Sequence, residues 1–173
     1  MEEPIVNPEE LRAAMIHTMV SRLEDVGKTK IQKLMYFLQD AYGLPLGCKF
    51  YLHYYGPYSD EVDSGISNLR FMGYVNVRPD AEGYGFHVTR NSTGEVGWAT
   101  VISNAEQQID SVVEHLGSMD VSQLELAATI HYVSKSSGFK KGDVIASVRS
   151  RKPKFSRELI SDAYDSLASM NLL

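Results

Sequence analysis

The sequence is almost without cysteine. Cys48 is the only one among 173 residues, so the chain cannot form an internal disulfide, and no other Cys or His stands near it at zinc-finger spacing. A chain that does not depend on disulfides is typical of a reducing compartment. The first residues, Met1-Glu2-Glu3-Pro4, are acidic where a signal peptide is basic, and no apolar run approaches the ~20 residues that span a bilayer. We therefore expect a cytoplasmic protein that does not associate with membranes.

Patterns that support catalysis are also missing. The five histidines, at positions 17, 53, 87, 115 and 131, form no i, i+4 pair and have no Cys or acidic companion at ligand spacing. The sequence contains no Gly-x-Ser-x-Gly elbow, and Cys48 has no nearby base that would make it a nucleophile. We therefore expect a protein that is not an enzyme and that uses no metal ion, no cofactor and no catalytic residue.

Positive charge is scarce outside one segment. The chain has 17 Lys and Arg against 22 Asp and Glu, a formal net charge of −5. Residues 1–134 carry −9 and residues 158–173 carry −3, whereas residues 135–157 carry +7. A basic segment this concentrated can attract phosphates or an acidic protein surface, or it can be a solvated loop and helix end.

Apolar residues at helical spacing are abundant and predict a mostly helical protein. Asn7-Pro8-Glu9-Glu10 is a typical helix start, and the apolar spacing that follows predicts a helix ending near Gly27. A second helix is expected from Thr29 to Gly43, and a third from Ser59 to Gly73.

The C-terminal half is also predicted to be helical. Ser103 with Glu106, and Ser122 with Glu125, match the capping box and are followed by apolar residues at helical spacing. A short helix near residues 143–148 and a last helix over about residues 156–170 complete the set.

Alternating apolar residues predict a small amount of β-structure. Residues 50–55 fit a short strand, after which Gly56-Pro57 turns the chain, and alternation on both sides of residues 79–83 fits a β-hairpin. The order helix, turn, helix, strand, helix, hairpin is close to that of a winged helix. We expect an α+β, mostly α fold in a single compact domain of residues 1–173: a winged-helix-like lobe over residues 1–100 with the short strand and hairpin, and a C-terminal helical bundle over residues 101–173.

Two interaction hypotheses follow from the side chains. The leading one is a protein-interaction or regulatory module, alone or as a homodimer, because tyrosines and lysines of the kind enriched at interfaces recur around the predicted strand. The predicted partner-binding residues are Lys30, Lys33, Tyr36, Tyr54, Tyr55, Pro57 and Tyr58. Alternatively, several of these tyrosines simply cover the core.

The alternative hypothesis is a winged-helix regulator that binds DNA or RNA. The third helix begins with Asp60, Glu61 and Asp63, which would repel phosphates, so its insertion into a DNA groove is disfavoured. Contact with nucleic acid would come from the basic segment instead, through Lys140, Lys141, Arg149, Arg151, Lys152, Lys154 and Arg157.

Four segments resemble a known family. They are residues 28–39 (KTKIQKLMYFLQ), 54–59 (YYGPYS), 124–130 (LELAATI) and 152–156 (KPKFS). With them the chain resembles the YwgA-like family of uncharacterised prokaryotic proteins and, more distantly, the Panacea domain of SocA-type antitoxins. The resemblance implies a compact helical fold with a small sheet. On the Panacea side it also implies binding and neutralisation of a partner toxin, or delivery of that toxin to a protease.

Overall fold

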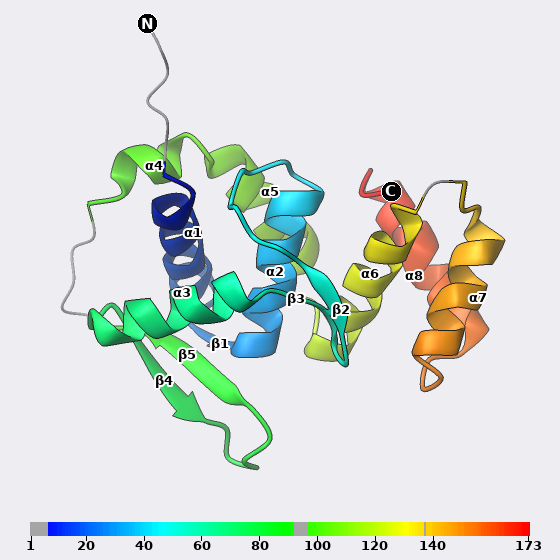
Figure 1. Cartoon of the computed structure of the whole chain (residues 1–173), viewed down its shortest axis with the longest axis horizontal. Coiled ribbons are helices and arrows are strands. Elements are labelled where there is room, and N and C mark those ends of the chain that lie inside the picture. The colour runs from blue at the N-terminus through cyan, green and yellow to red at the C-terminus, as the bar shows by residue number, and fades with distance from the viewer. Residues whose placement is uncertain (1–6, 92–96, 137) are drawn as a thin grey trace, which may run out of the picture.

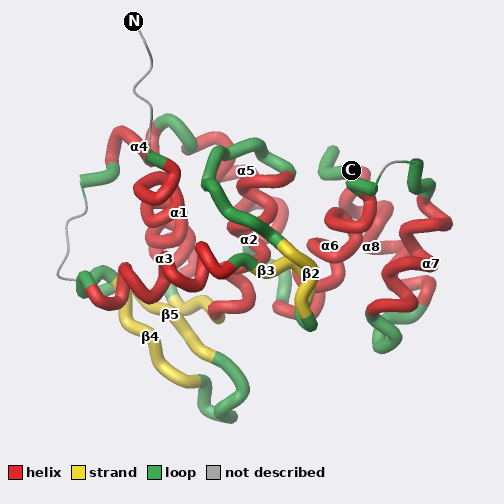
Figure 2. Tube along the Cα trace, viewed as in Figure 1, coloured by secondary structure: helices red, strands yellow, loops and turns green. Residues whose placement is uncertain are grey.

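The polypeptide is mostly helical with a small amount of antiparallel sheet, as expected for an α+β, mostly α protein (Figure 2). The computed structural model describes residues 7–91, 97–136 and 138–173. Within them the helices are α1 (Pro8–Leu23), α2 (Lys28–Asp40), α3 (Asp60–Phe71), α4 (Ala99–Ser103), α5 (Glu106–Leu116), α6 (Val121–Ser134), α7 (Lys141–Arg151) and α8 (Arg157–Ser169). The strands are β1 (Asp25–Gly27), β2 (Tyr51–His53), β3 (Gly56–Tyr58), β4 (Val75–Pro79) and β5 (Phe86–Arg90).

The five strands form two separate sheets. The larger has the order β1-β5-β4, and its central strand β5 pairs antiparallel with both neighbours, so that Val88 stands opposite Val26 and Val77. The predicted hairpin over residues 75–88 is confirmed as β4–β5. The smaller sheet is the β2–β3 hairpin. Here the prediction was incomplete, because Gly56 and Pro57 belong to strand β3 rather than to a simple turn.

The helices pack as two neighbouring groups (Figure 1). In the first group, α1 packs against α2, α3, α4 and α5, with the larger sheet on the same side as α3. In the second group, α6, α7 and α8 all pack against one another. The observed packing therefore places α4 and α5 with the N-terminal group, and the C-terminal bundle begins at α6. Helix α6 also packs against α2 and so joins the groups.

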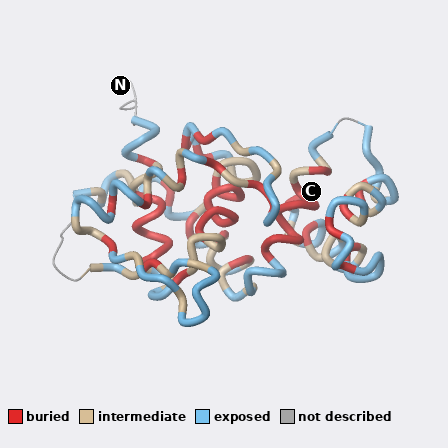
Figure 3. Tube along the Cα trace, turned by 60° about the horizontal axis from the view of Figure 1, so that its bottom comes forward, coloured by how far each residue is buried: buried red, intermediate tan, exposed pale blue. Residues whose placement is uncertain are grey.

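The centre of the molecule is formed by α2, whose residues 31–38 are all buried (Figure 3). Tyr36 is among them: it is 0% exposed, and its hydroxyl lies 2.7 Å from Nδ1 of His131 in α6. Burial raises the pKa of Tyr36 and lowers the pKa of His131 to about 4, so this pair is neutral at physiological pH. Tyr36 was predicted to bind a partner, and that prediction is wrong because the side chain belongs to the core.

Helix starts were predicted with mixed success. The first and last helices are confirmed, since Asn7 accepts from the Glu9 amide and Ser156 accepts from the Leu159 amide. The two predicted capping boxes are wrong. Residue 103 ends α4 and Ala105 precedes α5, while α6 begins two residues early with a box made by Asp120 and Gln123. This register turns Glu125 inward, where it is 2% exposed.

Candidate functional site

The four segments that resemble the YwgA-like family meet around one buried carboxylate, that of Glu125 in α6. Lys152 and Lys154, in the loop between α7 and α8, place their Nζ atoms 2.8 Å from Oε1 and 2.7 Å from Oε2 of this carboxylate. Lys33 of α2 donates to the carbonyl of Pro57 at 2.7 Å, and Lys152 donates to that of Tyr54. We refer to Lys33, Glu125, Lys152 and Lys154 as the lysine–glutamate cluster.

The cluster holds more positive than negative charge in a buried place. Lys33 is 1% exposed and Lys152 is 6% exposed. Burial lowers the pKa of Lys33 to about 8; nearby Glu125 opposes this shift, and nearby Lys152 adds to it. Among the described residues, Oε1 of Glu125 accepts no hydrogen bond of good geometry, although the Lys152 ammonium lies 2.8 Å from it. Glu125 is thus the carboxylate that compensates the lysines, and their burial depends on it.

The backbone of the β2–β3 hairpin is shaped to reach this cluster. Gly56 has a φ of 90°, and a Cβ at this position would lie 3.0 Å from Oγ1 of Thr129 and 3.3 Å from the carbonyl oxygen of Glu125. A side chain would therefore push the hairpin away from α6. On the other side, the side-chain amide of Gln32 in α2 binds the backbone of Ser59. Its Nε2 donates to the Ser59 carbonyl oxygen at 2.9 Å, and its Oε1 accepts from the Ser59 amide at 3.0 Å. The hairpin is fixed to α2 and to α6.

Above the cluster the hairpin exposes two tyrosines. Tyr54 is 76% and Tyr55 51% exposed, and their rings lie 4.9 Å apart at nearly right angles. Nζ of Lys152 lies 5.7 Å from the centre of the Tyr54 ring, so the start of the loop between α7 and α8 lies against the hairpin. We refer to Tyr54 and Tyr55 as the hairpin platform. It offers aromatic faces beside the Lys152 ammonium.

The predicted partner-binding residues divide into surface and interior. Tyr54 and Tyr55 are exposed, and Tyr58 is half-buried. Lys33 and Pro57 are buried, so the prediction that they form a surface is wrong for the same reason as for Tyr36. Lys30 is half-buried, and its Nζ donates to the carbonyls of Gly117 at 2.6 Å and Met119 at 2.8 Å. It fastens α2 to the connection between α5 and α6.

The basic segment is not one continuous free surface either. Arg149 donates to the carbonyls of Pro153 and Phe155 and shapes the loop after α7, while Lys141 pairs with Asp165 of α8 at 2.7 Å. Lys152 belongs to the buried cluster. The exposed members of the predicted nucleic-acid set are Lys140, Arg151, Lys154 and Arg157.

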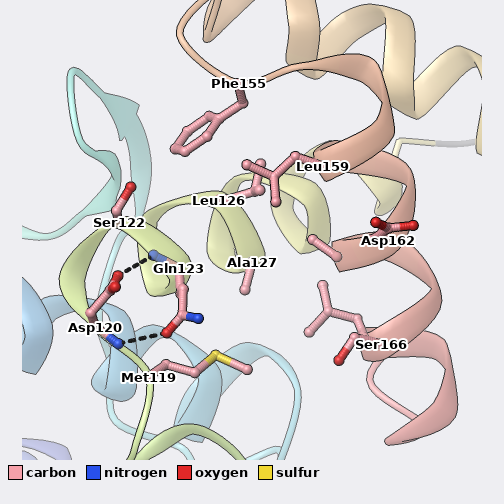
Figure 4. Close-up of a pocket in the computed structure, with 12 residues that line it drawn as sticks. Met119, Asp120, Ser122, Gln123, Leu126, Ala127, Phe155, Leu159, Asp162 and Ser166 are labelled. Carbon is pink, nitrogen blue, oxygen red and sulfur yellow. Dashed lines mark hydrogen bonds between the residues drawn. The ribbon is translucent and has the colours of Figure 1, made fainter.

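A groove lies between α6 and α8, and sequence reasoning missed it (Figure 4). It has a volume of about 330 Å³ and is lined by Met119, Asp120, Ser122, Gln123, Leu126, Ala127, Phe155, Leu159, Asp162, Ala163, Ser166 and Leu167. Each of the two helices has an apolar face of the kind that packs into a core. The sequence of either helix therefore does not tell whether the two faces pack fully against each other or leave a groove between them. The one available signal was that Phe155 belongs to the same short segment as two lysines of the cluster.

The described residues show no metal-binding group: in residues 7–91, 97–136 and 138–173, no three side chains of His, Cys, Asp or Glu gather closely enough to hold an ion. Cys48 is buried, and burial raises the pKa of its thiol. Among the described helices, none combines the length and the apolar character needed to cross a membrane.

Fold and site together define a mostly helical α+β protein in which buried lysines fix an aromatic hairpin beside an open apolar groove. No family model matches the chain. The chain is similar to the uncharacterised protein YwgA of Bacillus subtilis (strain 168), with 27% identity over 143 residues that cover 81% of this chain and 84% of that protein. This similarity supports the resemblance to YwgA-like proteins, a family of uncharacterised proteins.

Proposed function

We propose that the protein is a non-enzymatic interaction module that binds another protein through the hairpin platform. The main support is that two exposed tyrosines, Tyr54 and Tyr55, stand on a hairpin fixed from below by the lysine–glutamate cluster. Tyrosine contributes a large contact area at a low entropic cost, and a surface that is already ordered loses little freedom on binding. The platform therefore has the properties of an interface hot spot.

The charge around the platform favours an acidic partner. Lys154 and Arg151 are exposed in the same region of the chain, and the neighbouring cluster holds more lysines than carboxylates. An acidic protein surface is attracted by such a field. We further propose, on the resemblance to the Panacea domain, that the partner is a toxin-like protein, and that the complex forms in the cytoplasm, as the single cysteine indicates.

The test is affinity capture from cells of the source organism with quantitative mass spectrometry. Tyr54→Ala/Tyr55→Ala is expected to lower the recovery of a specific partner about tenfold, the loss typical of removing a hot spot. The control is Tyr84→Ala, which removes another exposed tyrosine at the tip of the other hairpin. Equal recovery with all three proteins, or no specific partner with the unaltered one, would rule out the proposal.

Single-stranded nucleic acid is a second candidate ligand for the same surface. The specific observation is that Lys152 joins the hairpin to the basic segment, so that bases could stack on Tyr54 while phosphates meet the exposed Arg151. Such a role would fit a winged-helix regulator of DNA or RNA. Fluorescence anisotropy with a labelled oligonucleotide would then show an affinity that falls steeply with salt and is lost in Arg151→Ala/Arg157→Ala, which changes two exposed residues outside the cluster. Negligible binding at low salt would eliminate this candidate.

A further inference from the structure

The groove between α6 and α8 has an apolar floor and acidic sides. Leu126 and Phe155 form part of the floor, and Leu159 lies at its edge with 49% of its surface exposed. Figure 4 shows Asp120 and Asp162 on opposite sides of this floor. An open apolar strip between two rows of polar side chains is the usual shape of a site that receives a helix.

The charges of the groove are of one sign. Neither lysine nor arginine is among its lining residues, and neither Asp120 nor Asp162 forms an ion pair within the described part of the chain. Lys30 is bound to the carbonyls of Gly117 and Met119, but its charge lies near Asp120, which opposes the lowering of the Lys30 pKa by burial; Lys154 is bound to Glu125. A ligand that covers the floor would therefore meet the carboxylate of Asp162, unpaired among the described residues, on one side and, on the other, the carboxylate of Asp120, which caps α6.

We propose that this groove binds an amphipathic helix of a partner protein, with its apolar stripe on the floor and lysines or arginines facing Asp120 and Asp162. The apolar stripe would anchor at i, i+3, i+4 and i+7 positions, as in other helix-in-groove complexes. An acidic helix would place like charges against the rims. This site is separate from the hairpin platform and does not depend on it.

The probe is a fluorescein-labelled helical peptide of about 14 residues, about 20 Å long, with Leu at the four anchor positions and Lys on both flanks. A matched peptide carries Glu in place of Lys. Fluorescence anisotropy with the full-length protein is expected to show that the Lys peptide binds at least about tenfold more tightly than the Glu peptide. The preference should shrink as salt rises, because the rim charges are exposed.

Two pairs of variants locate the binding in the groove. Asp162→Lys should weaken the Lys peptide about tenfold, whereas Glu158→Lys makes the same charge change on α8 outside the groove lining and should change the affinity less than about twofold. Leu159→Ser should also weaken binding of the Lys peptide about tenfold. Leu173 is 44% exposed and does not line the groove, so Leu173→Ser should leave the affinity unchanged. Leu159 and Leu173 are both exposed enough for the protein to remain folded when either is replaced by serine, and circular dichroism would verify this.

Three kinds of result would overturn the proposal. The first concerns the peptides themselves: equal affinity for both, or no saturable binding up to about 1 mM. The second is an equal loss of affinity in Asp162→Lys and Glu158→Lys. The third is a dimer in sedimentation velocity that Leu159→Ser dissociates, because a second copy of the chain would then occupy the groove. Tyr54→Ala/Tyr55→Ala should leave peptide binding unchanged, which separates this test from that of the platform.

Discussion

The two hairpins of the protein both display exposed aromatic side chains, but they are held in different ways. The β2–β3 hairpin, with Tyr54 and Tyr55, is fixed from below by buried lysines and by Gln32. The β4–β5 hairpin carries Tyr84, which is 91% exposed, and its contacts with Asp25, an ion pair from Arg78 and a hydrogen bond with His87, lie at the surface. Figure 1 shows that its tip extends away from the helices, whereas β2–β3 lies between α2 and α6.

The comparison shows that charged groups stabilise the two hairpins by different amounts, depending on whether they are buried. Surface ion pairs contribute about 0–1 kcal/mol each, because water screens them. Removal of one partner from a buried ion pair costs about 3–5 kcal/mol, because a charge is then left in the interior without compensation. The β2–β3 hairpin is thus held in place by interactions that tolerate little change, and its tyrosines can bind without first being ordered.

The largest expected effect comes from the carboxylate of the cluster. Glu125→Gln keeps the shape of the side chain but leaves Lys33 and Lys152 without a compensating charge, so it should lower the free energy of unfolding by about 3–5 kcal/mol. Asp25→Asn, at the other hairpin, should lower it by less than about 1 kcal/mol. Urea unfolding measures both. Similar losses in the two variants would remove the contrast between the hairpins.

The next largest effect is a dependence of the free energy of unfolding on pH, which comes from Lys33. Its pKa is lowered from 10.5 to about 8 in the folded protein. Between these values the unfolded chain binds a proton that the folded chain has released, so stability should rise with pH over this window, by up to about 3 kcal/mol. Below pH 8 both states hold the proton and the contribution is constant.

Lys33→Met is the matched variant for this measurement, because it removes the titrating group. Urea unfolding from pH 7 to pH 10.5 should show a smaller rise for the variant than for the unaltered protein. Parallel curves would mean that Lys33 keeps its ordinary pKa and that the cluster is more hydrated than the structure indicates.

A smaller effect is expected from the backbone of each hairpin. Gly83→Ala places a side chain at a φ of 76° in open space and should cost about 1 kcal/mol. Gly56→Ala combines a φ of 90° with a close approach to Thr129 and to the Glu125 carbonyl, and should cost about 2–3 kcal/mol. Thermal unfolding of the two variants compares them directly, and equal costs would show that α6 does not confine the hairpin.

The smallest effect on stability is expected from the exposed tyrosines themselves. Tyr54→Ala and Tyr84→Ala should each change the free energy of unfolding by no more than about 0.5 kcal/mol, because both rings are mostly in solvent. A loss above about 1 kcal/mol for Tyr54→Ala in urea unfolding would mean that its ring belongs to the hairpin's structure rather than to a binding surface.

The parts of the fold that could be predicted from sequence are those set by local patterns. Helical spacing identified α1, α2 and α3, and alternation identified β4–β5. Strand β1 was missed because three residues form no pattern, and its pairing depends on β5, more than 50 residues away. Strand β3 contains Gly56 and Pro57, which are turn residues in most contexts.

The site was predictable in its residue types but not in its layout. Lys33 follows Gln32 and precedes an apolar run of α2, and a lysine is usually at the surface. Its partner carbonyl at Pro57 lies 24 residues away, and the cluster joins it to Glu125, which is 92 residues away in the sequence. Only the tertiary fold brings these residues together. Lys33, which was predicted to lie on a binding surface, is instead buried beneath the hairpin that carries Tyr54 and Tyr55.

The most direct test of the account is hydrogen–deuterium exchange of the β2–β3 hairpin in the unaltered protein and in Glu125→Gln, measured by mass spectrometry under conditions where both are folded. If the lysine–glutamate cluster fixes this hairpin, exchange in residues 51–58 should accelerate at least about tenfold in the variant, while exchange in residues 75–90 stays the same. Unchanged exchange in residues 51–58, or an equal acceleration in both hairpins, would contradict the account.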